Sequence, residues 1–366
     1  MAGLYIHVPF CLRKCFYCDF YSVDDKSQIQ NFLSGLEKEI QLRSKILPDN
    51  LTFSTIYFGG GTPSLLQPDQ IQQIIWQLSQ TFCLTDIREV TLEANPATVT
   101  KDRINAFYDA GINRLSIGVQ SFLDKELALL GRLHSSREAI HFLQSAIDSQ
   151  IPEISVDLIY GLPGQTIEDW DKILQKALSF NLPHLSTYSL TWSEKTPLGQ
   201  RIISGELPAP LEEDVIEMAL HASTLLGDSG YEQYEVSNFA QPGHLSRHNE
   251  GYWKGEVYIG LGPSAHSFLE PDRWWNVSDV EAYCNDLLQD KLSVESRETL
   301  SPEQLRLEKI ALGLRCRDGV SITQLQLENV KVNEIVQQGL GECEDGKLIL
   351  TPNGLLLADE IAVQLS

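Results

Sequence analysis

Three of the seven cysteines lie within eight positions of one another, as Cys11, Cys15 and Cys18. Three neighbouring thiolates suit a soft metal, and cysteines grouped in this way hold iron–sulfur clusters. Three cysteines ligating four irons would leave one iron open to a ligand from outside the chain. The spacing therefore predicts a 4Fe–4S cluster with one open coordination position.

Other uses of these thiols fit less well. A structural zinc site usually takes four ligands, often in two separated pairs, and Cys83, Cys284, Cys316 and Cys343 are solitary. A disulfide framework is disfavoured because the chain is large, has an odd number of cysteines and carries no mark of secretion. A zinc site or an incidental group of thiols remains the alternative.

The cysteines follow a predicted strand. Leu4, Ile6 and Val8 alternate with Tyr5 and His7, and Pro9 ends the pattern because it cannot donate a hydrogen bond. Downstream, strands alternate with amphipathic helices. We expect strands at 51–58, 89–94, 114–119, 153–160 and 184–190, and helices at 29–48, 71–82, 100–111, 137–149, 166–180, 211–229 and 279–290. This alternation predicts a parallel sheet of βαβ units.

The two faces of the predicted strands differ. One register is apolar, with Val90 and Leu92 among its members. The opposite register holds Glu93, Ser116, Gly118, Gln120 and Asp157. A closed eight-stranded barrel fills its interior with branched apolar side chains. A polar interior instead indicates an open, six-stranded barrel that contains a ligand; the alternative is that sheet ends carry stray polar residues.

A glycine-rich loop, GGGTPS, follows the second strand and precedes a helix. Glycines there allow backbone groups to approach a ligand closely. A simple tight turn is the alternative.

The motif CxxxCxxC after the strand YIHVPF resembles that of the radical SAM proteins, in which S-adenosylmethionine (SAM) chelates the open iron. The resemblance implies that Gly60, Gly61 and Thr62 bind the methionine amino group. It narrows to the coproporphyrinogen dehydrogenase-like group, whose SAM-binding positions are matched by Tyr5, Tyr17, Glu93, Gln120, Arg132, Asp157 and Thr191. For Arg132 a solvated surface charge is the alternative.

This chain differs from the true dehydrogenases in two features, and in both it resembles the HemW branch, the heme chaperones. The dehydrogenases have a further cysteine where this chain has Phe20, and they have a longer segment before the first strand. The sequence HNEGYW, residues 248–253, also matches the HNxxYW signature of that branch.

The HemW resemblance implies a heme site. Its residues would be His248 as an axial ligand, together with Asn249, Tyr252 and Trp253. Arg247 and Arg273 could meet the heme propionates. The alternative is that residues 248–253 only pack the C-terminal region onto the barrel.

These patterns predict an α/β fold, an open (β/α)6 partial TIM-type barrel with a smaller C-terminal α+β domain. We assign residues 1–230 to the barrel, 231–300 to a connecting segment with the HNxxYW motif, and 301–366 to a winged-helix-like domain. The last of these contains a hairpin at GECEDGKLIL and a helix that begins at TPNG.

Composition limits the partners. The formal net charge is −22, which opposes general binding to nucleic acid or anionic membranes. No apolar run approaches the ~20 residues that span a bilayer, and the first residues lead directly into a strand without room for a signal peptide. We therefore expect a cytoplasmic protein.

The functional hypothesis is a heme chaperone that carries a 4Fe–4S cluster and SAM, and delivers heme to acceptors such as respiratory hemoproteins. A homodimer is a further expectation. The alternative is an oxygen-independent coproporphyrinogen III dehydrogenase, an enzyme that cleaves SAM reductively to a 5′-deoxyadenosyl radical. A third hypothesis is a protein that an iron–sulfur cluster merely stabilises. Phe20 and HNEGYW favour the first.

Overall fold

The computed structural model describes residues 2–366. Its centre is a run of six parallel strands that lie side by side in chain order. They are β1 (Ala2–Val8), β2 (Thr52–Gly60), β3 (Cys83–Ala94), β4 (Arg114–Gln120), β5 (Glu153–Tyr160) and β6 (His184–Ser189). The predicted α/β fold with an open six-stranded partial barrel is confirmed.

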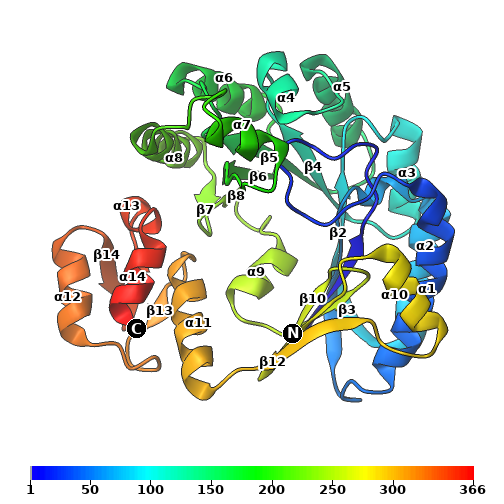
Figure 1. The fold of residues 1–366 in the computed structure, drawn as a ribbon. Coiled ribbons are helices and arrows are strands. Elements are labelled where there is room, and N and C mark those ends of the chain that lie inside the picture. The colour runs from blue at the N-terminus through cyan, green and yellow to red at the C-terminus, as the bar shows by residue number, and fades with distance from the viewer. Residues whose placement is uncertain (1) are drawn as a thin grey trace.

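Helices lie along the outside of this curved sheet (Figure 1). Those expected from periodicity are α1 (Ile29–Ser44), α2 (Pro68–Thr81), α3 (Lys101–Asp109), α5 (Ser136–Ile147), α6 (Ile167–Leu178) and α8 (Glu212–Asp228). Four shorter segments were not predicted: η1 (Lys26–Gln28), η2 (Pro63–Leu65), α4 (Asp124–Leu130) and α7 (Pro197–Ile203). The longest of these has seven residues, too few for a periodic pattern to stand out.

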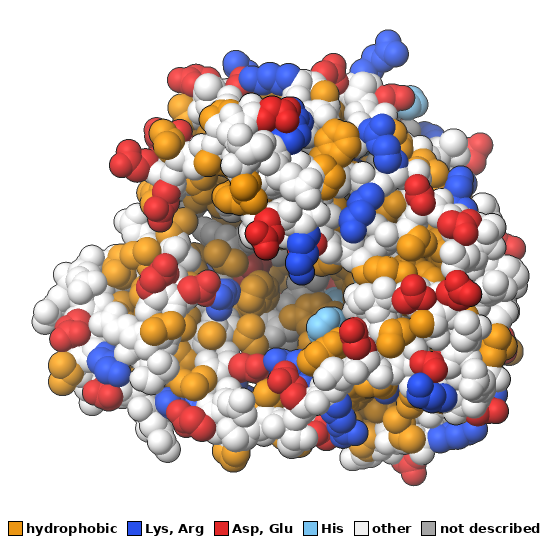
Figure 2. Space-filling view, viewed as in Figure 1, with side chains coloured by type: hydrophobic (Ala, Val, Ile, Leu, Met, Phe, Trp, Pro, Cys, Tyr) orange, Lys and Arg blue, Asp and Glu red, His pale blue; other side chains and the backbone are white. Residues whose placement is uncertain are grey.

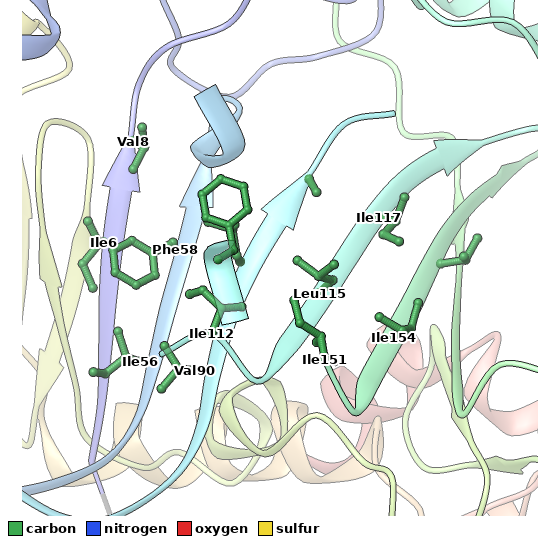
Figure 3. Close-up of a cluster of buried hydrophobic side chains, with 14 of the residues drawn as sticks. Ile6, Val8, Ile56, Phe58, Val90, Ile112, Leu115, Ile117, Ile151 and Ile154 are labelled. Atoms are coloured by element: carbon green, nitrogen blue, oxygen red, sulfur yellow. The ribbon is translucent and has the colours of Figure 1, made fainter. Parts of the chain in front are cut away.

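The apolar register of the strands forms the core beneath these helices. Figure 3 shows Ile56, Phe58, Val90, Leu115 and Ile117 side by side on neighbouring strands. All five are buried, as the alternation predicted. The opposite register is thereby turned toward the inside of the barrel.

Residues 231–300, predicted as a connecting segment, extend the sheet at both of its edges. Beside β6 lie β8 (Asn238–Ala240) and β7 (Glu232–Gln233), both in antiparallel pairings. Beside β1 lies β9 (Tyr258–Leu261), which is parallel to it, followed by the antiparallel strands β10 (His266–Leu269), β11 (Asp272–Asn276) and β12 (Val294–Thr299). Two helices belong to the same segment: α9 (Arg247–Trp253) and α10 (Val280–Leu288).

The C-terminal residues bury a second apolar cluster, which includes Leu314, Ile335 and Leu348. Its elements are α11 (Pro302–Leu314), β13 (Val320–Ser321), α12 (Asn329–Gln337), β14 (Gly341–Glu344), β15 (Lys347–Leu350), α13 (Pro352–Leu355) and α14 (Ala358–Leu365). Strands β14 and β15 form the expected hairpin, and Thr351 caps the short helix α13. Figure 1 shows these elements, coloured orange to red, as a group beside the barrel.

Among the helices of residues 2–366, none combines the length and the hydropathy that a membrane span requires.

Candidate functional site

The three clustered cysteines lie on the loop that leaves the carboxyl end of β1. Backbone hydrogen bonds hold this loop across the ends of the strands. The Cys11 amide donates to the carbonyl of Val23 at 2.9 Å, and the Phe16 amide donates to the carbonyl of Leu130 at 3.0 Å. All three thiols are free and partly exposed. The loop therefore presents them at the mouth of the barrel.

The thiols do not converge on one point. Within residues 2–366, no three side chains of His, Cys, Asp or Glu come close enough together to bind a single metal ion. A zinc site needs such convergence, because all its ligands bond the same ion. In a four-iron cluster each thiolate bonds a different iron, so the donor set suits the cluster better than zinc.

The glycine-rich loop packs directly against the cysteine loop. The Thr62 amide donates to the Phe10 carbonyl at 2.7 Å, and the Thr62 hydroxyl donates to Sγ of Cys11 at 3.5 Å. A Cβ added at Gly61 would lie 2.7 Å from the Phe10 carbonyl oxygen, closer than real Cβ atoms approach. Gly61 is therefore required for this contact, and the loop is more than a simple turn between β2 and α2.

Both loops border a cavity of about 560 Å³ at the open end of the barrel. It falls within the ~300–1,000 Å³ of typical small-molecule sites. Of the predicted cluster and SAM residues, the cavity collects Cys11, Cys15, Tyr17, Cys18, Gly60, Gly61, Thr62, Glu93, Gln120, Arg132, Asp157 and Thr191. Tyr5 is not in this wall. It stacks on Tyr57, with ring centroids 6.1 Å apart, and lines a second cavity next to the first.

Glu93 is a buried carboxyl in the cavity wall. It accepts hydrogen bonds from the Tyr57 hydroxyl at 2.9 Å and from the Gly60 amide at 3.2 Å. Burial raises the pKa of Glu93 to about 7, even though both hydrogen bonds act in the opposite direction. A cationic or amine ligand beside it would restore the charged form.

Asp157 lies on the neighbouring side of the same wall. Its two carboxyl oxygens accept from the Ser116 hydroxyl at 3.1 and 2.9 Å. Burial raises the pKa of Asp157, while hydrogen bonds from Ser186 and Ser116 oppose the shift. The site thus holds two buried carboxyls, both suited to accept hydrogen bonds from ligand hydroxyl or amine groups.

Gln120 and Arg132 show that the cavity is shaped for a polar ligand. Gln120 adopts a φ of 70°, unusual for a residue other than glycine, and its buried Oε1 has no hydrogen-bond partner among the described residues. Arg132 donates through Nη1 to Sγ of Cys15 at 3.4 Å, and its buried Nε is likewise unpartnered within residues 2–366. An unpaired buried polar atom costs about 1–3 kcal/mol, which a ligand would offset. The residues present therefore fit SAM.

The HNEGYW segment forms α9 at the other end of the barrel. His248 is 3% exposed. Its Nδ1 is hydrogen-bonded to the Thr55 hydroxyl at 2.8 Å, and its Nε2 to the Tyr252 hydroxyl at 2.9 Å. Burial lowers the pKa of His248 to about 3, so the ring is neutral. Because both ring nitrogens are occupied, His248 could ligate iron only after one of these hydrogen bonds breaks.

Three residues of the predicted heme set, Arg247, His248 and Tyr252, line a small pocket of about 200 Å³. Tyr252 also lines the second cavity, whereas Trp253 lies under the guanidinium of Arg315 at 6.0 Å and Asn249 is partly buried on the same helix. Arg273 also lines the second cavity. Arg247 is exposed, and its backbone amide donates to Glu89 at 2.9 Å.

Sequence reasoning did not identify Tyr57 and Tyr188, which both line the first cavity. Tyr57 could have been found, because it alternates with the buried Ile56 and Phe58 on β2 and so must face inward. Tyr188 lies near the end of the last predicted strand, where too few residues follow for alternation to show which face its side chain occupies.

Known proteins resemble this chain along its whole length. The sequence model of the radical SAM superfamily matches residues 5–177, and that of the HemN C-terminal domain matches residues 300–357. The chain is 35% identical to the heme chaperone HemW of Mycobacterium tuberculosis, over 98% of this chain and 93% of that protein. It is 32% identical to HemW of Bacillus subtilis, over 99% and 98% of the two chains.

A mitochondrial relative and a solved structure complete the comparison. The radical S-adenosyl methionine domain-containing protein 1 of Danio rerio is 36% identical over 97% of this chain and 83% of its own. The fold matches that of coproporphyrinogen III oxidase (HemN) from Escherichia coli with a TM-score of 0.85, covering 100% of this chain and 89% of that one at 23% identity. The chain therefore belongs to the radical SAM superfamily, in the branch that contains the heme chaperone HemW.

Proposed function

We propose that this protein binds heme and delivers it to acceptor hemoproteins, and that it carries a 4Fe–4S cluster and SAM in the first cavity. Cys11, Cys15 and Cys18 would hold the cluster. The superfamily implies both cofactors, and together they supply one-electron chemistry when bound. The proposed location is the cytoplasm and the proposed partners are heme acceptors, with a homodimer as a further hypothesis.

Different polar groups of the first cavity would bind different parts of the SAM molecule. Glu93 and the backbone of residues 60–62 would bind the amino group. Asp157 would accept from the ribose hydroxyls, and Arg132 would donate to the carboxylate, which its planar fork of N–H groups suits. Tyr17, Gln120 and Thr191 complete the proposed wall. Tyr5 would act through Tyr57, on which it stacks, rather than by touching the ligand.

One observation carries the choice of a chaperone over an enzyme. The position that holds a further cysteine in the resembling dehydrogenases is Phe20 here. Its side chain is 70% exposed and borders both cavities. An exposed aromatic ring at this place offers a surface for a flat macrocycle, and it has no thiol that could take part in chemistry.

The second candidate is an oxygen-independent coproporphyrinogen III dehydrogenase. The similarity of the whole fold to HemN favours it, although at 23% identity this likeness shows the fold alone.

An anaerobic experiment separates the two candidates. The reconstituted protein is incubated with SAM, a reductant and coproporphyrinogen III in one tube, and titrated with heme in another. We expect one heme per chain and no protoporphyrinogen IX. Formation of protoporphyrinogen IX would establish the enzyme instead, and absence of heme binding would remove the chaperone hypothesis.

A further inference from the structure

A second cavity of about 560 Å³ lies between the barrel and the C-terminal unit. Its walls come from β1, the end of the cysteine loop, α9, β9 to β11, and helix α11. Figure 2 shows a hollow between these two parts of the chain, with hydrophobic side chains on its inner surface. The volume again falls within the ~300–1,000 Å³ of ligand sites.

Aromatic rings line this cavity from several elements. Tyr252 of α9 meets Tyr258 of β9 edge to face, with centroids 4.6 Å apart, and Phe268 of β10 lies 6.4 Å beyond Tyr258. Phe20 adds its exposed ring from the cysteine loop, and Leu312 of α11 lies in the wall opposite. Rings and aliphatic chains on facing walls suit a broad, flat, apolar ligand.

Two histidines line the cavity, and their imidazoles differ in what they can bind. In His7, Nδ1 is hydrogen-bonded to the Tyr5 hydroxyl at 3.2 Å, and Nε2 donates to the Tyr21 carbonyl at 2.9 Å. For His266, no hydrogen bond to a ring nitrogen is found in residues 2–366. Its ring stacks on Trp275, with centroids 5.6 Å apart and planes inclined by 20°, which fixes its orientation. His266 therefore offers a held imidazole with free nitrogens.

Charges of both signs border the same cavity: the cations Arg273 and Lys309, and the carboxylates of Asp19, Glu256 and Glu308. Arg273 forms ion pairs with Glu308 at 2.8 Å and Glu298 at 3.5 Å, and Lys309 lies 3.6 Å from Glu270. Such partly exposed pairs are weak, because water screens them. The carboxylates of a ligand could therefore replace the glutamates as partners of Arg273 and Lys309.

We propose that heme binds in this second cavity with His266 as an axial ligand of the iron. The proposal rests on the function proposed above and names its site. The rings of Tyr252, Tyr258, Phe268 and Phe20 would flank the macrocycle, and Arg273 and Lys309 would meet its propionates.

This placement gives His248 a different role from the one that its motif suggests. The Nε2 atom of His248 holds the Tyr252 hydroxyl, and Tyr252 is part of the cavity wall. His248 is therefore a positioning residue that orients the wall, while His266 touches the iron. The two roles predict different responses to porphyrins with and without iron.

The test uses the full-length reconstituted protein and two probes, hemin and metal-free protoporphyrin IX. Wild type is compared with His266→Ala, His248→Ala and the surface control His141→Ala, whose side chain is exposed on α5. We expect His266→Ala to weaken hemin binding at least tenfold, to shift the heme spectrum and to leave protoporphyrin IX affinity within twofold of wild type. Added imidazole should restore the spectrum of His266→Ala.

The other variants complete the test. His248→Ala should weaken hemin and protoporphyrin IX equally and keep the wild-type spectrum of bound heme, and His141→Ala should match wild type with both probes. A wild-type spectrum in His266→Ala, or loss of the iron ligand in His248→Ala alone, would overturn the His266 site and leave the chaperone function standing. Failure of the wild-type protein to bind hemin would end both proposals.

Discussion

The ring of Tyr57 stacks on the imidazole of His248, with centroids 5.0 Å apart and planes inclined by 25°. Tyr57 also donates to Glu93 in the first cavity, and His248 holds Tyr252 in the wall of the second. Four side chains in contact thus connect the proposed SAM site with the proposed heme site. The HNEGYW helix is the part of the chain that completes this connection.

His248→Ala should destabilise the fold. The substitution removes a buried ring and leaves Thr55 without its hydrogen bond. Tyr252 loses its bond to the same ring. We expect a loss of about 3 kcal/mol in the free energy of unfolding, measured by urea titration. His141→Ala should stay within about 0.5 kcal/mol of wild type. Equal stability of the two variants would show that the hydrogen bonds of His248 contribute nothing to folding.

Cys15→Ala should abolish the cluster. Loss of one of three thiolate ligands leaves a second iron without a protein ligand. We expect anaerobic reconstitution to give about four irons per chain in wild type, and almost none in the variant, by iron analysis and visible absorption. Cys83→Ala, at an exposed position of β3 outside the cavity, should reconstitute normally. Zinc in place of iron in protein purified without air would refute the cluster assignment.

Asp157→Ala should weaken SAM binding without loss of the cluster. The carboxyl lies in the cavity wall and accepts from the Ser116 hydroxyl, and no hydrogen bond joins it to a cysteine within residues 2–366. We expect at least a tenfold rise in the dissociation constant by calorimetric titration, about 1.4 kcal/mol or more. The exposed Asp214→Ala on α8 serves as the control. Unchanged affinity in Asp157→Ala would mean that this carboxyl does not meet the ligand.

Glu93 should make the stability of the ligand-free protein depend on pH. Burial raises its pKa to about 7 from the ordinary value of 4.5. Between these two values the unfolded chain releases the proton and the folded chain keeps it, so stability falls as pH rises and then levels off above pH 7. The full effect is about 3 kcal/mol.

Urea unfolding of the cluster-free chain at pH 4.5, 6 and 7.5 checks this expectation. Glu93→Gln should lose less stability than wild type across the range, and the exposed Glu217→Gln should follow wild type. Parallel curves for wild type and Glu93→Gln would show that folding does not change the pKa of Glu93.

Alternation along the strands was enough to predict the barrel and the strand residues that face the first cavity, whereas the loop residues of that cavity were predicted from the cysteine spacing and the family resemblance. Val90 and Leu92 had to face the helices, which turned Glu93 inward without knowledge of any contact. The same rule predicts that Tyr5 faces inward. It borders the second cavity, however, because helix α11 of the C-terminal unit supplies another wall of that cavity. That helix begins almost 300 residues later, so no local sequence pattern around Tyr5 shows that it lines the second cavity and not the first.

The role of His248 was hidden for a related reason. Its motif resembles a heme-binding signature, whereas its partner Thr55 is 193 residues away in the sequence. Spacing within the motif shows Tyr252 one helical turn further on, but not that both ring nitrogens are occupied. His266 drew no attention in the sequence, because a lone histidine on a short strand has no pattern around it.

The parallel pairing of β9 with β1 has a consequence for biosynthesis. Strand β1, which leads into the cysteine loop, gains its first neighbour when β2 is complete at Gly60 and its second only when Tyr258–Leu261 have been made. At ~5–20 residues per second, a ribosome needs roughly 10–40 s for the segment in between. During that interval β1, the strand that leads into the cysteine loop, has β2 as its neighbour on one side and keeps an unpaired edge on the side that β9 later covers.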